Sequence, residues 1–334
     1  MISDRTLPSC SIMKPNHVWE SRHVLLNVHD RLKSITAAHL QQWLTATQIQ
    51  AKSGKLPTYI PVLSQIQSDL LAVTIQTNSS SSVELGDVEK PFVLMSLIKP
   101  FLLLFLLTQV GREAIFSRVG IEPSDQPFHS IAQLSSDRGR PRNPMINSGA
   151  IFLASLLPGN SATSRCESLR YWLNKSAGCD LMLDEEMLAS VQSLGNETNR
   201  SIANLLKRAG YLDDIDLVIE TYNQICCLSG TVVDLARLGL LIALPDPNVS
   251  SDDQHIVNSL MMTCGLYEAS SRYSMRIGLP IKSGVSGGLI AIVPKVGSIA
   301  IYSPAIDEIG NSVGGLFLLE QLVHAHRLSL FQTD

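Results

Sequence analysis

The feature that most constrains the fold of this chain is one long apolar stretch, residues 92–110, which reads FVLMSLIKPFLLLFLLTQV. It is nearly long enough to cross a lipid bilayer, but Lys99 and Pro100 interrupt it halfway. A charge near the centre of an isolated span costs about 2.5 to 3.5 kcal/mol, and the uninterrupted apolar part is about half a span. The stretch therefore predicts a buried helix in a soluble core, with no membrane partner and one lysine whose burial needs a chemical reason.

The composition indicates a folded chain with room for an enclosed site. Of its 334 residues, 45% are hydrophobic and 17% are charged, which argues against disorder. Twenty-six basic residues against 30 acidic ones give a net charge of −4, so no basic excess attracts nucleic acid or anionic lipid. A small neutral or zwitterionic ligand fits this balance better.

Cysteine usage and the first residues predict a cytoplasmic protein. None of the six cysteines forms a C-x-x-C pair, so we expect reduced, buried thiols and no zinc or redox site. The chain opens MISDRTLPSCSIMKPNHVWESR, which lacks the continuous apolar core of a signal peptide. Residues 1–30 show no clear periodicity, and we treat them as an N-terminal extension.

The order of helix-like and strand-like segments predicts an α+β fold. Helical spacing covers three stretches, residues 32–52, most of 91–246, and 311–330. Alternation predicts four strands, the first two joined as a hairpin, at residues 71–77, 83–85, 289–293 and 298–302. Strands near both ends of the chain, with a helical block between them, indicate an antiparallel sheet flanked by helices plus a mainly helical lobe.

The sharpest local signal is Ser96-Leu97-Ile98-Lys99, an S-x-x-K pattern within the apolar stretch. Three-residue spacing puts Ser96 and Lys99 on one helical face, close enough for the lysine to take the serine proton. The lysine must be neutral to act as a base, and apolar neighbours lower its pKa from the usual value of about 10.4. Taken alone, the four letters favour a plainer interpretation, a lysine that extends to the protein surface.

A second motif, Lys282-Ser283-Gly284, precedes the predicted strand 289–293. Serine hydrolases of the penicillin-recognising class pair an S-x-x-K helix with a K-[ST]-G edge strand, whose backbone polarises the acyl carbonyl. Residues 284–288 also spell G-x-S-x-G, the nucleophile elbow of α/β-hydrolases, but that motif needs a helix after it and here a strand follows. No S-x-N or Y-x-N occurs in the chain, which counts against a β-lactam enzyme.

Longer strings point to one family. The most specific are GRPRNPMINSGAI (139–151) and GLPIKSGVSGGLIAIVP (278–294), and others include PTYIPVL (57–63), NRSIANLL (199–206), YNQICCL (222–228) and TCGLYEAS (263–270). The chain resembles the serine-dependent glutaminases, in order from about residue 50 to 325. The resemblance implies a β-lactamase/DD-peptidase-like fold and hydrolysis of the side-chain amide of L-glutamine to L-glutamate and ammonia.

The resemblance also implies an organisation and a set of partners. Residues 31–334 would form the glutaminase domain, with an α/β lobe from about 31–95 and 275–334 and a helical lobe at about 96–274. The small-molecule substrate would be L-glutamine, and no cofactor and no metal would be needed. A homo-oligomer, either a dimer or a tetramer, is expected.

Carried over by motif, the resemblance makes Ser96 the nucleophile and Lys99 its base. The backbone N–H groups of Ser96 and Val285 would form the oxyanion hole, and Tyr267 would lie beside the serine and move protons. Four more side chains would line the pocket or hold the substrate: Tyr59, Asn147, Asn199 and Tyr222. Amide groups offer donors and acceptors to a zwitterion, and a tyrosine hydroxyl can give and take one proton.

The chain departs from the family pattern at one substrate contact. Members usually have a Glu seven residues before the Asn of the NR-[AS]-[IL]-A motif, where it meets the substrate ammonium; counting back from Asn199 puts Gln192 there. Two interpretations are open. Either Gln192 binds the α-amino group as a neutral amide, or the helix is shifted by a gap and Glu197, the nearest carboxylate, takes the position. Met95 also stands where the bacterial pattern often has Gln.

Two rival functions remain at this point. One is a β-lactam- or peptide-directed serine hydrolase of the same fold, against which the missing middle motif argues. The other is a non-catalytic glutamine-binding protein, motivated by Gln192 and Met95. The intact Ser96, Lys99 and Tyr267 favour the enzyme. His129, which could be mistaken for a catalytic base, is expected to be a loop or core histidine, because Lys99 already fills that role.

Overall fold

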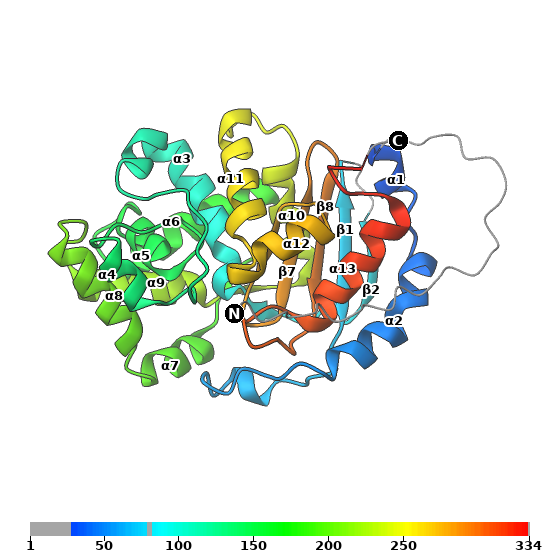
Figure 1. Cartoon of the computed structure of the whole chain (residues 1–334), viewed down its shortest axis with the longest axis horizontal. Helices are drawn as coiled ribbons and strands as arrows, with labels where there is room; N and C mark the ends of the chain where they lie inside the picture. The colour runs from blue at the N-terminus through cyan, green and yellow to red at the C-terminus, as the bar shows by residue number, and fades with distance from the viewer. Residues whose placement is uncertain (1–27, 79–81, 333–334) are drawn as a thin grey trace, which may run out of the picture.

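The computed structural model describes residues 28–78 and 82–332. Most of the N-terminal extension expected at 1–30 therefore lies outside the described residues. Figure 1 shows the two parts of the molecule side by side, with a helical part at one end and a sheet covered by helices at the other.

The larger sheet contains every strand that alternation predicted. Its five strands run antiparallel in the order β2-β1-β8-β7-β6. Their bounds are β1 Ala72–Thr77, β2 Ser82–Gly86, β6 Ile281–Ser283, β7 Gly288–Val293 and β8 Gly297–Tyr302. Because the N-terminal hairpin pairs with the C-terminal strands through β1 and β8, the prediction of a sheet made from both parts of the chain is confirmed.

Both faces of this sheet are buried, and the alternation of side chains decides which core each one enters. In β7, Leu289 and Ala291 join one apolar cluster, whereas Ile290 and Ile292 join the other. The first cluster lies under α1 Val28–Lys33, α2 Ala37–Ala51, α12 Ser270–Arg276 and α13 Val313–His326. The second lies under α10 Val232–Ala243, which packs on β1, β7 and β8. Continuous apolar strands such as GLIAIV are typical of a sheet that is covered on both sides.

Helix ends differ from the sequence prediction where a polar residue caps the helix. The helical stretch expected at 32–52 divides into α1 and α2, because Thr36 has extended backbone and its side chain accepts the N–H of His39. The final helix starts later than expected, at Val313, since Ser312 caps it by accepting the N–H of Gly315. It ends where Arg327 adopts a left-handed conformation, with φ 51°.

The helical lobe packs around one apolar helix, α3 Ile98–Phe116. Around it lie α4 Ile131–Ser136, α5 Asn147–Ser155, α6 Ala162–Ala177, α7 Glu185–Ser193, α8 Glu197–Arg208, α9 Ile215–Cys226 and α11 Ser251–Cys264. A small antiparallel sheet that the sequence did not predict joins this lobe to the start of α3, in the order β3-β5-β4. Its strands are β3 Phe92–Val93, β4 Met182–Leu183 and β5 Leu228–Gly230, too short for alternation to reveal them.

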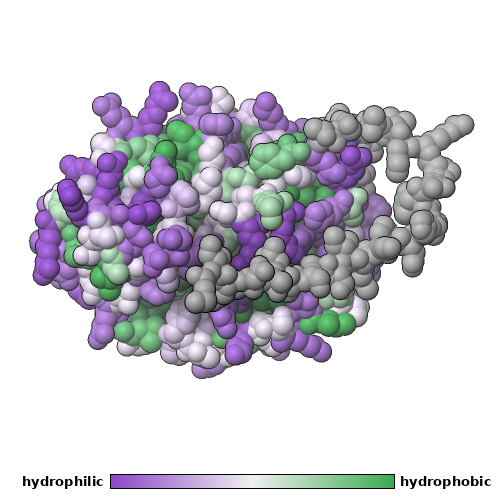
Figure 2. Space-filling view, in the orientation of Figure 1, coloured by the Kyte–Doolittle hydropathy of each residue, from purple (hydrophilic) through white to green (hydrophobic). Residues whose placement is uncertain are grey.

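The apolar stretch forms a helix of the protein core. Residues 95–116 are long and apolar enough to cross a membrane by length and composition, but 72% of the most apolar window is buried inside the protein. On the face drawn in Figure 2, hydrophilic side chains predominate and hydrophobic ones form small scattered groups. The helix breaks at Gly111, which has φ 80°, and Pro100 sits in its first turn, where its missing N–H breaks no helical hydrogen bond.

Candidate active site

A cavity of about 610 Å³ lies between the two parts of the molecule. Its wall includes Ser96 and Phe128, the start of α8, the end of α9, and the loop from Ile306 to Gly310. Six of the nine predicted site residues line it, namely Tyr59, Ser96, Asn147, Asn199, Tyr222 and Val285. Tyr267 is not part of the wall but contacts the Ser96 side chain. The fold therefore brings segments from far apart in the sequence to one hollow.

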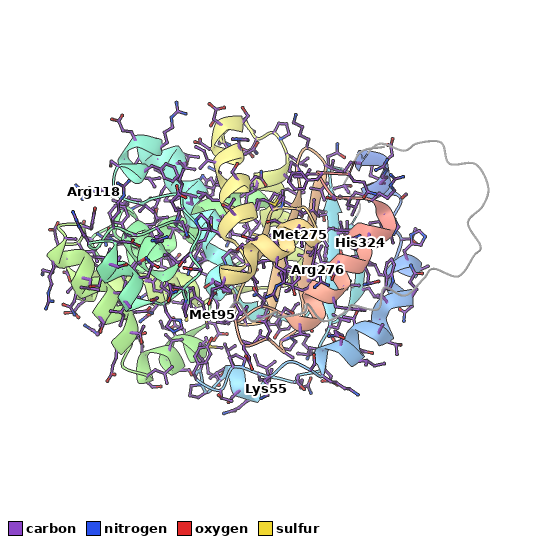
Figure 3. All side chains as sticks on the ribbon, viewed as in Figure 1. Lys55, Met95, Arg118, Met275, Arg276 and His324 are labelled. Atoms are coloured by element: carbon purple, nitrogen blue, oxygen red, sulfur yellow. The ribbon has the colours of Figure 1, made fainter. Side chains whose placement is uncertain are left out.

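Ser96 lies in a tight turn and not on the regular helix that the sequence predicted. It belongs to a short 3₁₀ helix, Met95–Leu97, and α3 begins just after it. Met95 before it has φ 48°, a left-handed conformation that is uncommon for a side chain of this size. Figure 3 shows Met95 where the helical part meets the sheet. Ser96 is 7% exposed and faces the cavity at this junction.

The backbone of the segment Lys282-Ser283-Gly284 lies directly against the turn that carries Ser96. A Cβ atom on Gly284 would lie 2.8 Å from the carbonyl oxygen of Leu94 and 3.1 Å from the side chain of Leu97. Only glycine fits at this contact without a shift of the backbone. The prediction that a K-[ST]-G strand faces the S-x-x-K segment is therefore confirmed, and Val285, which follows, lines the cavity.

Lys99 is fully buried, and its burial has a chemical consequence. Its Nζ donates to Asn147 Oδ1 at 2.8 Å and to the Met145 carbonyl oxygen at 3.2 Å, and Ser96 Oγ is not among its partners in the described structure. Burial lowers the pKa of Lys99 from 10.5 to about 8, and the nearby Cys226 opposes this slightly. A lysine with this pKa is partly neutral near pH 7 to 8 and can accept a proton.

Asn147 is the centre of a hydrogen-bond network that joins three predicted site residues to Lys99. Its Oδ1 accepts from Lys99 and, at 3.2 Å, from the Tyr222 hydroxyl. Its Nδ2 donates to Asn199 Oδ1 at 3.0 Å. Asn147 stands at the first turn of α5, Asn199 at the first turn of α8, and Tyr222 near the end of α9. Three helices of the helical lobe thus meet at one amide.

Tyr267 is held by two groups on the sheet side of the cavity. Its hydroxyl donates to the Ser283 carbonyl oxygen at 3.1 Å, and it also bonds the Ser96 side chain. Burial raises the pKa of Tyr267 above its ordinary value, so the phenol stays protonated at neutral pH. Like Met95, Tyr267 has left-handed backbone, with φ 57°. Two residues in this uncommon conformation flank the serine, as is frequent at functional sites.

Lys282 is a second fully buried lysine, and it stabilises the position of Tyr267. Its Nζ lies 4.4 Å from the centre of the Tyr267 ring and donates to the carbonyl oxygens of Gly265 and Ser283. Burial, and then the nearby charge of Lys99, lowers the pKa of Lys282 well below its ordinary value. Both buried lysines of the site therefore have a lowered pKa.

The structure corrects the expectation for Gln192. This side chain is exposed, is absent from the cavity wall, and donates its Nε2 to both carboxylate oxygens of Glu220 at 3.0 Å. Glu197, the other candidate, does line the cavity. The reason is local: α7 ends at Ser193 and the next helix starts at Glu197, so the intervening turn sends the two side chains in different directions.

Several cavity residues were not predicted from the sequence, among them Asn223, Cys226 and Phe128. Cys226 stands four residues after Tyr222, so helical spacing from a predicted site residue would have found it. Burial raises the pKa of its thiol to about 11, which makes it a poor nucleophile. The G-x-S-x-G elbow is correctly rejected, because β7 follows it directly at Gly288.

Comparison with known proteins decides the family. A family model described as Glutaminase matches residues 54–331. The glutaminase of Synechocystis sp. is 45% identical over 314 residues, which cover 93% of this chain and 93% of that protein. The chain belongs to the glutaminase family. This glutaminase is thus a hydrolase of the glutamine side-chain amide, as the resemblance predicted.

Solved glutaminase structures share the fold of this glutaminase. The crystal structure of a probable glutaminase from Bacillus subtilis is 30% identical, with a TM-score of 0.82, and the match covers 88% of this chain and 97% of that one. Another is a covalent complex of a Bacillus subtilis glutaminase with 5-oxo-L-norleucine, formed by reaction with 6-diazo-5-oxo-L-norleucine. It is 30% identical, with a TM-score of 0.80, and the match covers 88% of this chain and 99% of that one. The predicted β-lactamase-like fold is confirmed.

Proposed function

We propose that this glutaminase works through an acyl-enzyme on Ser96. Lys99 takes the proton of the Ser96 hydroxyl as Oγ attacks the side-chain amide carbon of L-glutamine. The backbone N–H groups of Ser96 and Val285 stabilise the oxyanion that forms. The observation that carries this proposal is the burial of Lys99, because a pKa of about 8 leaves a useful fraction of neutral amine at physiological pH.

The proton then moves to the leaving group. Tyr267 gives its hydroxyl proton to the amide nitrogen and regains one from Lys99, and the C–N bond breaks to release ammonia. The raised pKa of Tyr267 suits this role, since the hydroxyl is protonated before the transfer. Water attacks the γ-glutamyl ester by the reverse path: Lys99 accepts a proton from the water, the ester C–O bond breaks to release L-glutamate, and Lys99 returns the proton to Ser96 Oγ.

The remaining cavity residues would hold the substrate. Asn147, Asn199 and Tyr222 form a connected set of polar groups next to Lys99, which suits the carboxylate or the amide of glutamine. Tyr59 is 54% exposed and lies at the mouth of the cavity, where its ring would cover bound glutamine. A covalent complex of a related glutaminase with 5-oxo-L-norleucine supports a nucleophile within such a cavity.

We also propose the wider setting of the enzyme. It would act in the cytoplasm as a homo-oligomer, a dimer or a tetramer. Its domain would divide into an α/β lobe near residues 31–95 and 275–334 and a helical lobe near 96–274, with the cavity between them. Sedimentation of the purified full chain measures the oligomeric state, and a monomer at micromolar concentration would contradict that part of the proposal.

The mechanism is tested by ammonia release from L-glutamine. Ser96→Ala should abolish turnover and leave the thermal unfolding temperature unchanged, because the substitution removes one hydroxyl from a packed turn. Lys99→Met should cause a similar loss that high pH does not restore. Ser193→Ala is the matched control, since its exposed hydroxyl bonds only the Ser190 carbonyl of its own helix. Retained turnover in Ser96→Ala would overturn the assignment.

Two companion substrates separate this reaction from its rivals. L-asparagine has a side chain one methylene shorter, so its amide would not reach Ser96 Oγ while its head group is bound, and much slower turnover is expected. A chromogenic cephalosporin should not be hydrolysed. Binding of glutamine without any ammonia release would instead support a non-catalytic glutamine-binding protein.

A further inference from the structure

The cavity at Ser96 is larger than glutamine requires. Its volume is about 610 Å³. A water molecule, which has one non-hydrogen atom, occupies about 30 Å³ in the liquid, so the roughly ten non-hydrogen atoms of glutamine fill about 300 Å³ on the same scale. Cavities of about 300 to 1,000 Å³ commonly bind ligands larger than an amino acid. The remaining space is sufficient for a further group attached to the substrate.

The direction of the substrate amide decides where such a group would lie. Asn147, Asn199 and Tyr222 lie on the helical side of the cavity, where they are proposed above to hold glutamine. Tyr267, the proposed proton donor to the leaving nitrogen, contacts Ser96 from the sheet side. A substituted amide is planar and trans, so a group on its nitrogen points away from the glutamyl carbon chain. A substituent on the side-chain nitrogen therefore extends along the sheet side of the cavity.

On that side, the absence of a side chain at Gly310 leaves a recess beside the reacting groups. A Cβ atom on Gly310 would lie 3.3 Å from Val285 Cγ1 and 3.6 Å from Tyr267 Cε2. It would lie 3.9 Å from Phe128 Cε1, and the Phe128 and Tyr267 rings are in contact, with centres 4.6 Å apart. Gly310, Val285 and Phe128 line the cavity, so the recess opens into it. Its walls are a methyl group and two aromatic rings, which suit an apolar group.

The loop that forms this recess is held in place by its own hydrogen bonds. Asp307 Oδ1 accepts the backbone N–H groups of Ile309, Gly310 and Asn311. The Asp307 N–H donates in turn to the Asn311 carbonyl oxygen. The recess is therefore preformed, and a bound group does not have to order it. Glu308, an exposed carboxylate on the same loop that lines the cavity, disfavours a negatively charged substituent.

We propose that this glutaminase also hydrolyses γ-glutamyl alkylamides, and that their N-alkyl group occupies the recess at Gly310 between Phe128, Tyr267 and Val285. The proposal rests on the reaction proposed above and extends it to a second class of substrate. Ser96 Oγ forms the same γ-glutamyl ester and the C–N bond breaks. Tyr267 donates a proton to the nitrogen, so a primary alkylamine leaves in place of ammonia. Water then releases L-glutamate as it does with glutamine.

The test measures L-glutamate release by the full-length enzyme from L-glutamine and from its side-chain N-methyl, N-ethyl and N-propyl amides. A fully buried methylene strengthens binding by about fourfold, so kcat/KM should rise by about that factor from the methyl to the ethyl compound. In γ-glutamylglycine a carboxylate replaces the terminal methyl of the ethyl group, and its kcat/KM should be lower than that of the ethyl compound by about tenfold or more. A kcat/KM that falls with every added carbon, or a γ-glutamylglycine rate equal to that of the ethylamide, would overturn the inference.

A variant tests the recess itself. Gly310→Ala places a methyl group in it, so kcat/KM for the ethylamide relative to glutamine should fall by about tenfold. Because the ratio is taken within one variant, an effect on the nucleophile or on the glutamyl end changes both rates alike. Gly210→Ala is the matched control: this exposed glycine also has left-handed backbone, with φ 77°, but nothing lies within 4 Å of an added Cβ, and the ratio should stay unchanged.

The outcomes separate this inference from the proposed function. An unchanged ratio in folded Gly310→Ala would overturn the assignment of the recess. Gly310 has φ 108°, so thermal unfolding must show that this variant is folded, and the wild-type alkylamide series decides independently of it. Hydrolysis of glutamine with no hydrolysis of any alkylamide would overturn the inference alone, whereas failure to hydrolyse glutamine would overturn the reaction on which it rests.

Discussion

Asn147→Asp offers a direct test of how the fold sets the basicity of Lys99. The substitution keeps the shape of the side chain and places a carboxylate where an amide oxygen now accepts from Lys99 Nζ at 2.8 Å. Two unit charges at this distance attract by about 6 kcal/mol at an effective dielectric constant of about 20, which is an upper bound because the carboxylate is also desolvated. Opposite charges at contact usually move a pKa by about 1 to 3.

A rise of about 2 takes the pKa of Lys99 from about 8 to about 10. At pH 7.5 the neutral fraction of the amine then falls from about 24% to about 0.3%, a loss of about 75-fold in the reactive form. The assay is ammonia release at saturating glutamine from pH 6 to about 11, one unit above the expected midpoint of the variant. The wild-type rate should rise with pH to a plateau, with its midpoint near 8, because the lysine must lose its proton to act.

In Asn147→Asp the midpoint should move up by about 2, and the rate at high pH should recover most of the loss. Asn199→Asp is the matched control: its carboxylate lies one amide further from Lys99, so its midpoint should move less. The use of saturating substrate separates the change in basicity from a change in binding. A midpoint that stays near 8 in Asn147→Asp would refute the argument that Lys99 is the titrating base.

Two further predictions concern groups outside the cavity. Gln192→Glu should not lower the KM for glutamine, because this side chain lies outside the cavity, and a KM that falls tenfold would contradict that placement. The same substitution should lower the unfolding temperature at pH 8 more than at pH 5. The new carboxylate lies against Glu220, and the two repel each other when both are ionised. Burial, then the neighbouring His39, lowers the pKa of His326 from 6.5 to about 4. Because the unfolded chain binds this proton more readily, the stability contributed by neutral His326 should be fully present above about pH 6.5 and decrease towards pH 4. His326→Gln should weaken that decrease in thermal unfolding measured across this range. An unchanged pH dependence would show that other groups cause it.

Much of the fold follows from local pattern. Alternating apolar residues predict the four longer strands, and the single apolar stretch predicts the central helix of the helical lobe. Local pattern does not predict the two- and three-residue strands of the small sheet. These strands are stabilised by pairing with partners distant in the sequence, and they are too short to show a periodicity. Cap residues decide helix ends, so the divided helix at 32–52 depends on the extended backbone of Thr36.

The sequence by itself determined which residues could carry the chemistry. Ser96 and Lys99 stand at a fixed spacing, and Lys282, Ser283 and Gly284 follow in the order that a serine hydrolase of this class requires. Spacing along a chain is local information, and it is retained in any fold that keeps the turn and the strand intact.

Only the tertiary structure decided what these residues can do. The lowered pKa of Lys99 depends on its complete removal from water, and its main hydrogen-bond partner is an amide that α5 brings to it from residue 147. The choice between Gln192 and Glu197 likewise depends on a turn that directs one side chain to Glu220 and the other to the cavity. Desolvation and hydrogen bonding act over a few ångströms in space. They join groups that are far apart in the sequence, so the sequence spacing of these groups does not predict that they will be in contact.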